Sequence, residues 1–414
     1  MIAADLSLGT RAIAALRRVD PRAHAFYLYD LDLLAGRARR FLAAFHGVHA
    51  LAAYAVKANG LPAILDCLRA EGVGAEAGSL GELELAAASG FDPGNCVLNG
   101  NGRTIEEVEW AVARGVHSVN ADHVGELDVL AGAATRAGRT LRVALRVNPG
   151  IETPGHAYVA TGHDEAKFGI SPREALEVWG ARSRWPSLDL GGVHVHVGSQ
   201  LLDVVPLEGA AAEALALKRA AADRGATLTW LNLGGGFGVD YEGRAEFPLE
   251  RHARRIAELV ANAHVELVFE PGRWMVAPVG MLLAEVLWIK HRDGRRFVVL
   301  AAGMNDFIRP ALYHARHRIA PVAPRAGEVT TAVVVGPVCE SGDVFEEAAL
   351  LPPLERGEWV AILDTGAYGA AMASNYNGRG RLAEIVSRDG RLLRARAAET
   401  PADLLRRRED VLEG

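Results

Sequence analysis

The chain has 414 residues, of which half are hydrophobic, and its formal net charge is −6. No stretch of about 18 apolar residues is free of charge, and the start of the chain lacks the basic segment and apolar core of a signal peptide. No basic cluster interleaved with aromatic residues offers a surface for nucleic acid. We therefore expect a cytoplasmic protein of two domains that binds small molecules, with neither nucleic acid nor a membrane as a partner.

Residues from about 50 to 275 repeat one pattern, a short apolar run followed by a polar or glycine-containing turn and then by a helical stretch. Eight such units favour a closed (β/α)8 TIM barrel with parallel strands over the alternative, a doubly wound open sheet. The expected strands are Leu51–Val56, Val73–Ala77, Asn95–Leu98, Val116–Asn120, Leu141–Val147, Leu188–Val197, Thr227–Leu233 and Val265–Phe269. The expected helices include Leu80–Ser89, Thr104–Arg114, Val124–Arg136, Pro172–Ala181, Leu207–Asp223 and Leu249–Asn262.

After residue 275 the pattern changes to apolar strands joined by turns, which predicts an antiparallel β domain. The expected strands are Gly280–Ile289, Arg296–Leu300, Thr330–Val335, Trp359–Leu363, Ala383–Ser387 and Leu392–Arg394. We assign residues 26–275 to the barrel and residues 1–25 together with 276–414 to the β domain. The run Phe26–Tyr29 is expected to pair with the sheet of that domain.

Polar or glycine residues end most of the expected barrel strands. The carboxyl ends of the strands of such a barrel meet at one face, and this face carries the active site. The residues at these ends are Lys57, Glu76, Arg146, His196, Gly198, Ser199, Gly234, Gly235, Gly236, Glu270, Pro271, Gly272 and Arg273. One site can therefore use them all.

A glycine run, Gly234-Gly235-Gly236, follows the seventh expected strand. Barrels commonly bind phosphate there through backbone N–H groups. Ser199 would add a hydroxyl to such a site and Arg273 a cation. A phosphate site beside the amine of Lys57 suggests pyridoxal phosphate, whose aldehyde binds a lysine covalently. Lys57 as a general base or as a solvated strand end is the alternative.

Glu270 would pair with the pyridine nitrogen of this cofactor and keep it protonated, which favours loss of a group from Cα. His196 can stack on the ring. His194 lies on the same strand face, and the His-x-His pattern also occurs in metal-dependent barrel hydrolases. Against a metal, the ends of strands five and eight bring no further histidine or aspartate, and the three widely spaced cysteines form no CxxC pair. We therefore expect no metal site.

Several motifs resemble the fold-type III pyridoxal-phosphate decarboxylases, whose barrel is similar to that of alanine racemase, and most closely the diaminopimelate decarboxylases. The resemblance runs from Phe26 to about Leu405. The motifs are Tyr54-Ala55-Val56-Lys57-Ala58-Asn59, His194-Val195-His196-Val197-Gly198-Ser199-Gln200, Gly234-Gly235-Gly236, Glu270-Pro271-Gly272-Arg273, Gly303-Met304-Asn305-Asp306-Phe307-Ile308-Arg309-Pro310-Ala311-Leu312-Tyr313, Gly336-Pro337-Val338-Cys339-Glu340-Ser341-Gly342-Asp343 and Gly366-Ala367-Tyr368-Gly369.

The resemblance implies a role for each matching residue. Lys57 binds the cofactor covalently, and Cys339 returns a proton to Cα after carbon dioxide has left. The residues implied to hold the cofactor are Lys57, His196, Ser199, Gly235, Gly236, Glu270, Gly272, Arg273 and Tyr368. Those implied to hold the substrate are Arg273, Arg309, Tyr313, Glu340 and Tyr368. The resemblance also implies a homodimer, in which Cys339 and Glu340 reach the cofactor of the neighbouring subunit.

The implied reaction is the decarboxylation of meso-2,6-diaminopimelate to L-lysine and carbon dioxide, a step of lysine biosynthesis. Related decarboxylases that act on ornithine, carboxynorspermidine or amino acids linked to a carrier protein or siderophore intermediate are the alternatives. Arg309, Tyr313 and Glu340 favour a substrate with a carboxylate and an amine at its far end. A barrel protein that only carries the cofactor would lack the β domain.

Overall fold

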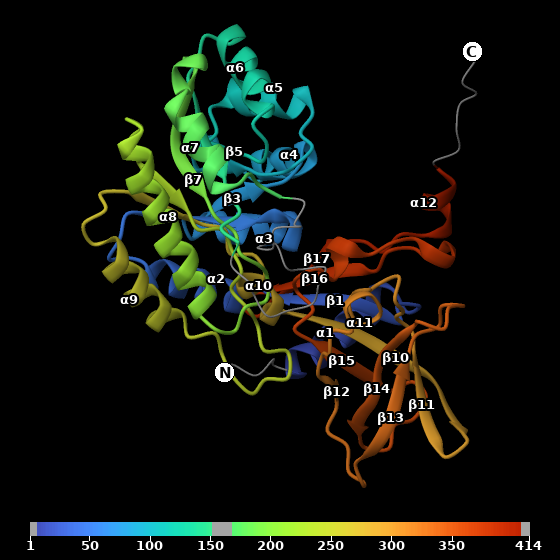
Figure 1. Cartoon of the computed structure of the whole chain (residues 1–414). Coiled ribbons are helices and arrows are strands. Elements are labelled where there is room, and N and C mark those ends of the chain that lie inside the picture. The colour runs from blue at the N-terminus through green and yellow to red at the C-terminus, as the bar shows by residue number, and fades with distance from the viewer. Residues whose placement is uncertain (1–5, 151–167, 407–414) are drawn as a thin grey trace. The chain divides into compact units, whose positions relative to one another are not determined.

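The computed structural model describes residues 6–150 and 168–406, and it divides into two compact units (Figure 1). The barrel unit comprises Leu34–Asp240, apart from the undescribed stretch, and Glu246–Met275. The sheet unit comprises the described residues up to Leu33, the short segment Tyr241–Ala245 and the described residues from Val276 onward. Within the described ranges, no helix has the length and apolar character that crossing a membrane requires.

The barrel unit closes through parallel strands, as predicted. Its strands are β2 (Ala50–Ala55), β3 (Gly74–Ala77), β4 (Cys96–Leu98), β5 (Ser118–Ala121), β6 (Leu141–Arg146), β7 (Leu188–His194), β8 (Trp230–Asn232) and β9 (Glu266–Phe269). Each pairs in parallel with the next, and β2 pairs with β9, where Leu51 lies opposite Val268. The closing pair rules out the open doubly wound sheet.

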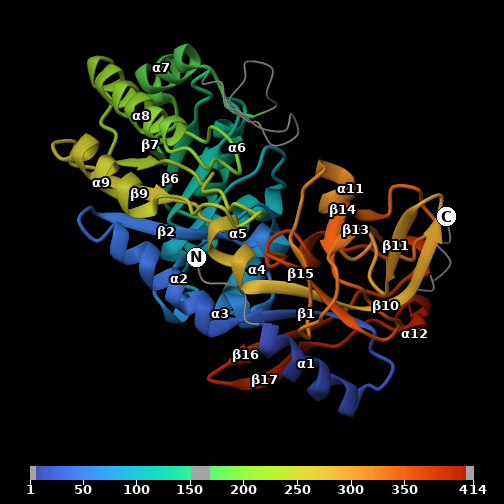
Figure 2. The same cartoon turned by 90° about the horizontal axis from the view of Figure 1, so that it is seen from below.

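Helices surround the barrel, one of them ahead of the first barrel strand and the others after it (Figure 2). They are α2 (Leu31–Ala44), α3 (Pro62–Ala70), α4 (Leu80–Ala88), α5 (Ile105–Arg114), α6 (Glu126–Arg136), α7 (Pro172–Gly180), α8 (Val205–Asp223), α9 (Leu249–Val260) and α10 (Arg273–Val276). Capping boxes begin two of them, Thr104 with Glu107 at α5 and Ser171 with Glu174 at α7. Such caps satisfy N–H groups that the first turn of a helix leaves without partners.

Trp230 fills the interior of the barrel. It is completely buried and packs with Ala53, Val97, Ala144 and Val268. The indole needs a glycine beside it, because a Cβ built on Gly192 would lie 2.2 Å from the Cε2 atom of Trp230. The pairing of a large residue with small ones therefore sets the packing of this layer.

An ionic cluster lies beside Trp230. Glu266 contacts His117 at 3.2 Å and Arg142 at 3.0 Å, and the Arg142 guanidinium lies 4.2 Å from the centre of the indole ring. The hydrogen bond from His117, followed by the one from Arg142, lowers the pKa of Glu266 to about 2. Glu266 begins its strand, at the end of the barrel away from the strand termini that carry the candidate site, so we assign this cluster to stability.

The sheet unit is mostly antiparallel. Its strands are β1 (Ala25–Asp30), β10 (Gly280–Arg292), β11 (Arg295–Leu300), β12 (Ile319–Pro321), β13 (Thr330–Val335), β14 (Val344–Leu351), β15 (Trp359–Leu363), β16 (Ala383–Arg388) and β17 (Arg391–Arg396). The pairs β1 with β16 and β11 with β13 are parallel, whereas the other pairs of described strands are antiparallel. Sequence patterns did not predict β12 or β14. The helices of this unit are α1 (Leu6–Val19), α11 (Arg309–Tyr313) and α12 (Pro401–Leu405).

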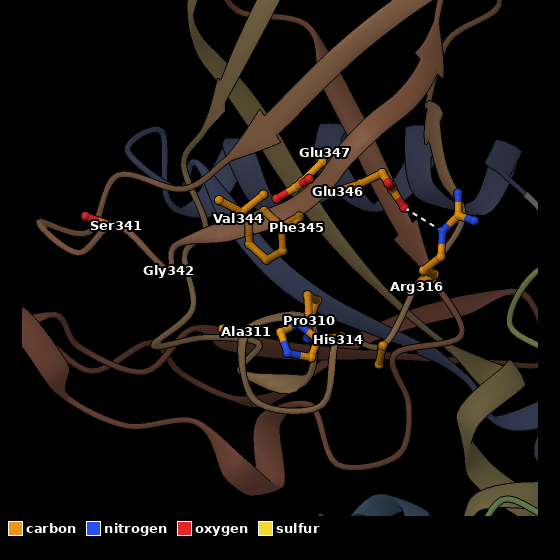
Figure 3. A pocket seen from close by; sticks show the side chains of 11 residues that line it. Pro310, Ala311, His314, Arg316, Ser341, Gly342, Val344, Phe345, Glu346 and Glu347 are labelled. Carbon is orange, nitrogen blue, oxygen red and sulfur yellow. Dashed lines mark hydrogen bonds and ion pairs between the residues drawn. The ribbon is translucent and has the colours of Figure 1, made fainter. Parts of the chain in front are cut away.

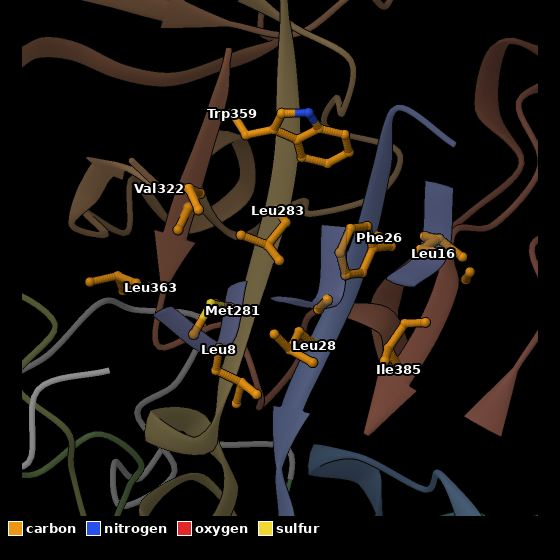
Figure 4. Packing of buried hydrophobic residues seen from close by; sticks show 13 residues of the cluster. Leu8, Leu16, Phe26, Leu28, Met281, Leu283, Val322, Trp359, Leu363 and Ile385 are labelled. Atoms are coloured by element: carbon orange, nitrogen blue, oxygen red, sulfur yellow. The ribbon is translucent and has the colours of Figure 1, made fainter. Parts of the chain in front are cut away.

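Strand β1 lies between β10 and β16, so the expected pairing of Phe26–Tyr29 with the C-terminal sheet is confirmed. This pairing places the chain up to Leu33 in the sheet unit, whereas the sequence pattern placed the boundary at residue 25. Helix α1 packs beside β1 (Figure 2). Leu8 and Leu16 of this helix meet Phe26, Leu283 and other apolar side chains of the sheet in one buried cluster (Figure 4).

Candidate active site

Lys57 lies just beyond β2, in a short 3-10 turn formed by Val56–Ala58. The strand ends at Ala55, one residue earlier than predicted. Ala55 and Ala58 are buried, and a Cβ built on Gly272 would lie 3.0 Å and 3.2 Å from their Cβ atoms. The run of small residues around Lys57 therefore lets the β9 loop approach the lysine closely.

The Lys57 amine pairs with a buried carboxylate. Its Nζ atom lies 3.1 Å from Oε2 and 3.3 Å from Oε1 of Glu76, which is completely buried at the end of β3. The Lys57 side chain itself is 53% exposed. An amine that is held by a buried carboxylate and yet open to solvent can be reached by a small molecule.

Three asparagine amides converge on one oxygen of Glu270. Oε1 of Glu270 accepts from Asn99 Nδ2 at 2.9 Å, from Asn120 Nδ2 at 3.2 Å and from Asn232 Nδ2 at 2.8 Å. Asn99 Nδ2 also donates to Glu76 Oε1 at 2.9 Å. The amide of Asn99 thus connects the carboxylate beside Lys57 with the carboxylate of Glu270.

Two histidines extend from β7 and its continuation toward these groups. His194 is buried, and its Nε2 atom lies 3.7 Å from Glu270 Oε2. His196 Nδ1 accepts from the backbone N–H of Gly235 at 3.2 Å. Burial, and next the positive charge of Arg146, lowers the pKa of both imidazoles well below the usual value, so both rings are neutral at pH 7.

The glycine run after β8 forms a tight turn that a side chain would disrupt. Gly234 and Gly236 have φ angles of +63° and +97°. A Cβ built on Gly235 would lie 2.4 Å from the carbonyl oxygen of Glu270. Beside this turn, the Arg273 guanidinium donates to the Ser199 hydroxyl at 3.2 Å. A backbone turn without side chains, next to a hydroxyl and a cation, is chemically suited to a phosphate group.

These groups together fit pyridoxal phosphate. The aldehyde requires an accessible amine, which Lys57 provides, and the phosphate requires a cradle without side chains, which the glycine turn provides. A carboxylate stabilises a protonated ring nitrogen, and Glu270 could provide it. Among the described residues no cluster of three or more histidine, cysteine, aspartate or glutamate side chains is arranged to hold a metal ion.

In the sheet unit, Arg309 begins α11 and is buried. Its guanidinium lies 5.0 Å from the ring centre of Tyr241 and 5.9 Å from that of Tyr313, and its Nε donates to His317 Nε2 at 3.4 Å. Aromatic rings close to a guanidinium stabilise its positive charge through cation–π attraction. Arg309 and Tyr313, two of the expected substrate residues, are therefore neighbours.

Cys339 and Glu340 share one exposed loop. The Cys339 N–H donates to Asn377 Oδ1 at 3.2 Å, and the Tyr376 hydroxyl donates to Glu340 Oε2 at 3.5 Å. Asp343 anchors the loop, because its Oδ2 accepts from the Val338 N–H at 2.7 Å. The other Asp343 oxygen accepts from the N–H of residue 304 at 2.6 Å, and this bond joins the loop to the segment that leads into α11.

Beside this loop, a cavity of about 360 Å³ lies between α11 and the start of β14 (Figure 3). Pro310 and His314 line one side of it, and Val344 and Phe345 line the other. None of the expected substrate residues lines this cavity. Glu340 instead lines a second cavity, of about 370 Å³, together with Phe297 and Val335.

Tyr368 stands in a strained turn of the sheet unit. Its φ angle is +56°, an uncommon value for a residue with a side chain. The glycines on either side are required by close packing, because a Cβ on Gly366 would lie 1.9 Å from the carbonyl oxygen of Val276 and one on Gly369 2.5 Å from that of Thr365. Strain of this kind is often stored at functional sites.

Comparison with known proteins identifies the family. Residues 31–277 match the family model described as the pyridoxal-dependent decarboxylase, pyridoxal binding domain. The chain belongs to the pyridoxal-dependent decarboxylases. This result confirms the expected family, the decarboxylase class and the cofactor, pyridoxal phosphate.

Curated relatives of this decarboxylase extend the match to both units. The chain is 38% identical over 392 residues to diaminopimelate decarboxylase from Helicobacter pylori strain J99, which covers 94% of this chain and 96% of the relative. It is also 38% identical to the Zymomonas mobilis diaminopimelate decarboxylase, over 93% of this chain and 92% of the relative. The structure of the H. pylori enzyme complexed with L-lysine matches with a TM-score of 0.90 and 37% identity, and covers 95% of this chain and 98% of that chain.

The sequence patterns missed the three asparagines around Glu270. Asparagine is depleted in strands, yet here it stands within one residue of the carboxyl ends of β4, β5 and β8. This recurrence is a signal that the sequence offers, because strand ends on one barrel face meet. The structure brings together the candidates of the barrel unit, and it brings Arg309 near Tyr313 and Cys339 near Glu340 in the sheet unit.

Proposed function

We propose that this decarboxylase converts meso-2,6-diaminopimelate to L-lysine and carbon dioxide. The observation that carries the proposal is the match to diaminopimelate decarboxylases over more than nine tenths of the chain. The match includes the sheet unit, where Arg309, Tyr313 and Glu340 stand. A barrel alone could serve many amino acids, so the part of the match that lies outside the barrel supports this substrate.

The residues of the barrel unit, together with Tyr368 of the sheet unit, then take roles toward the cofactor. Bound pyridoxal phosphate supplies a ring that accepts electrons from the bond that breaks at Cα. Lys57 would hold the aldehyde, Glu270 would keep the ring nitrogen protonated, and His196 would contact the ring. The groups that hold the phosphate are Ser199, Gly235, Gly236, Gly272, Arg273 and Tyr368.

The substrate's far end is held by the residues of α11 and by Glu340. Arg309 and Tyr313 bind the distal carboxylate, and Arg273 and Tyr368 are the further residues that we assign to the substrate. Glu340 binds the distal amine. A substrate with both groups makes charge-assisted hydrogen bonds at both, whereas a diamine precursor such as ornithine has no carboxylate for Arg309.

Cys339 returns the proton to Cα. Its side chain is exposed, which suits a thiol that serves a site of another copy of the chain. We propose a homodimer in the cytoplasm, in which Cys339 and Glu340 of one subunit complete the site of the other. A monomer would then lack the proton donor and the group that binds the distal amine.

A substrate panel tests the proposed function. The purified protein, loaded with pyridoxal phosphate, is offered meso-diaminopimelate, ornithine, carboxynorspermidine and carrier-linked amino acids, and kcat/KM is measured by carbon dioxide release. The proposal requires meso-diaminopimelate to be preferred by at least about tenfold, because one lost charge-assisted hydrogen bond has that effect. Preference for any other member of the panel would overturn the assignment of the substrate.

A further inference from the structure

The direction of the asparagine amides around Glu270 is set by their surroundings. Asn120 Nδ2 faces two acceptors, Asn99 Oδ1 at 2.6 Å and Glu270 Oε1 at 3.2 Å. Asn99 Nδ2 likewise faces two carboxylates, those of Glu76 and Glu270. Turning either amide around would place oxygen against oxygen. The N–H groups therefore point at Glu270 Oε1.

This arrangement of donors favours an ionised Glu270. A proton on Oε1 would meet only donors, because three N–H groups already surround that oxygen. A proton on Oε2 would need an acceptor, but His194 Nε2 is 3.7 Å away, which is too far for a hydrogen bond. An ionised Glu270 meets all three donors at Oε1 and has no proton that needs an acceptor.

The same arrangement makes the two oxygens of Glu270 unequal. A carboxylate oxygen has two lone pairs, and three donors saturate Oε1. Among the described residues, the hydrogen bonds to this carboxylate all go to Oε1. Any further donor must therefore meet Oε2.

We propose that Asn99, Asn120 and Asn232 are positioning residues that hold Glu270 charged and turned so that Oε2 receives the protonated ring nitrogen of pyridoxal phosphate. The inference rests on the proposed function, since it assigns the cofactor ring to Glu270. The three amides come from the ends of three separate strands, so they meet only when the barrel closes. We call Asn99, Asn120 and Asn232 the asparagine clamp. Asn232 also accepts from the Gly234 N–H at 2.9 Å, which links the clamp to the phosphate turn.

The test compares two cofactors that differ only at the ring nitrogen. The full-length protein, freed of cofactor, is titrated with pyridoxal phosphate and with 1-deazapyridoxal phosphate, in which C–H replaces that nitrogen. Wild-type protein should bind pyridoxal phosphate about tenfold or more tightly than the analogue, since the analogue leaves Oε2 without a donor. Asn120→Ala should reduce this preference to within about twofold.

Two further variants separate positioning from general stability. Asn120→Asp keeps the size of the side chain but replaces the donor by an acceptor, so it should also lose the preference even if Asn120→Ala does not fold. Ser118→Ala removes another buried polar group from β5, two residues earlier on the same face, and should keep the preference. A second readout is the ¹⁵N chemical shift of bound labelled pyridoxal phosphate, which should report a protonated ring nitrogen only when all three asparagines are present.

Each outcome decides between distinct errors. If the Asn120 variants keep the wild-type preference for pyridoxal phosphate over the analogue, the inference is wrong, while the proposed function stands. This holds also where both cofactors bind more weakly by the same factor, because the amides are then only structural. If wild-type protein binds pyridoxal phosphate without forming a covalent bond through Lys57, the proposed function itself fails.

Discussion

Asp306 offers a test of the sheet unit through pH. Its side chain is 2% exposed, and burial raises its pKa to about 7 from an ordinary value of 3.8. Oδ2 accepts from the Gly303 N–H at 2.9 Å and Oδ1 accepts from Asn305 Nδ2 at 2.9 Å. These two hydrogen bonds do not outweigh the loss of solvent around the carboxylate.

The sign of the effect follows from proton binding. The folded state binds the Asp306 proton more tightly than the unfolded state, so the free energy of unfolding is highest below pH 3.8 and falls as the pH rises through about 7. A shift of about 3 pKa units corresponds to about 4 kcal/mol at pH 8. The substitution Asp306→Asn removes this penalty but loses one of two acceptor oxygens, at a cost of about 1 kcal/mol.

We therefore expect Asp306→Asn to raise the free energy of unfolding by about 2 to 3 kcal/mol at pH 8 and to leave it nearly unchanged at pH 4.5. Urea denaturation of the two proteins at both pH values, followed by tryptophan fluorescence, measures the difference. The exposed Asp389, at the turn between β16 and β17, gives the matched control Asp389→Asn. A variant that is less stable at pH 8, or equally altered at both pH values, would refute the reasoning.

Three further predictions concern the barrel and the assembly. Glu266→Gln should lower the free energy of unfolding by roughly 1 to 2 kcal/mol above pH 4.5, after allowance for solvent screening. Denaturation curves should show that this loss vanishes as the pH falls toward 2, because the carboxylate is stabilised only while it is ionised. Gly272→Ala should weaken cofactor binding severalfold in an absorbance titration, since the added Cβ presses on the turn that holds Lys57, whereas Gly102→Ala, with open space around its Cβ, should not. Lys57→Ala and Cys339→Ala proteins mixed in equal amounts should recover about one quarter of wild-type activity. Half of the randomly formed dimers then contain one subunit of each variant, and each of these dimers has one intact site of two. If no activity returned, shared sites would be contradicted.

The sequence patterns predicted the barrel well because each βα unit is local. They missed β14, whose Glu346-Glu347-Ala348-Ala349 core favours a helix, and it forms a strand because β13 lies beside it. The strand β12 is only three residues long and ends in Pro321, so it leaves little local signal. Pairing partners distant in the sequence decide both strands.

The residues of the candidate site also differ in how far the local sequence predicts them. Lys57 and Glu270 were predicted because each stands at a strand end within a recognisable motif. Asn99, Asn120 and Asn232 were not predicted, because a single asparagine carries little information and the three meet only when β4, β5 and β8 close into a barrel. The packing of Gly272 on the alanines around Lys57 is likewise a contact between strands that are far apart in the sequence.

The central claim is that Lys57 holds pyridoxal phosphate in an enzyme that decarboxylates meso-diaminopimelate. In the most direct measurement, the purified protein is loaded with pyridoxal phosphate and given meso-diaminopimelate. L-lysine is measured by chromatography and carbon dioxide by trapping. The absorbance band at about 420 nm reports the lysine-bound cofactor. The account predicts equal amounts of L-lysine and carbon dioxide from wild-type protein, and neither product nor the band from Lys57→Ala. Carbon dioxide without L-lysine, or a retained band in the Lys57 variant, would contradict it.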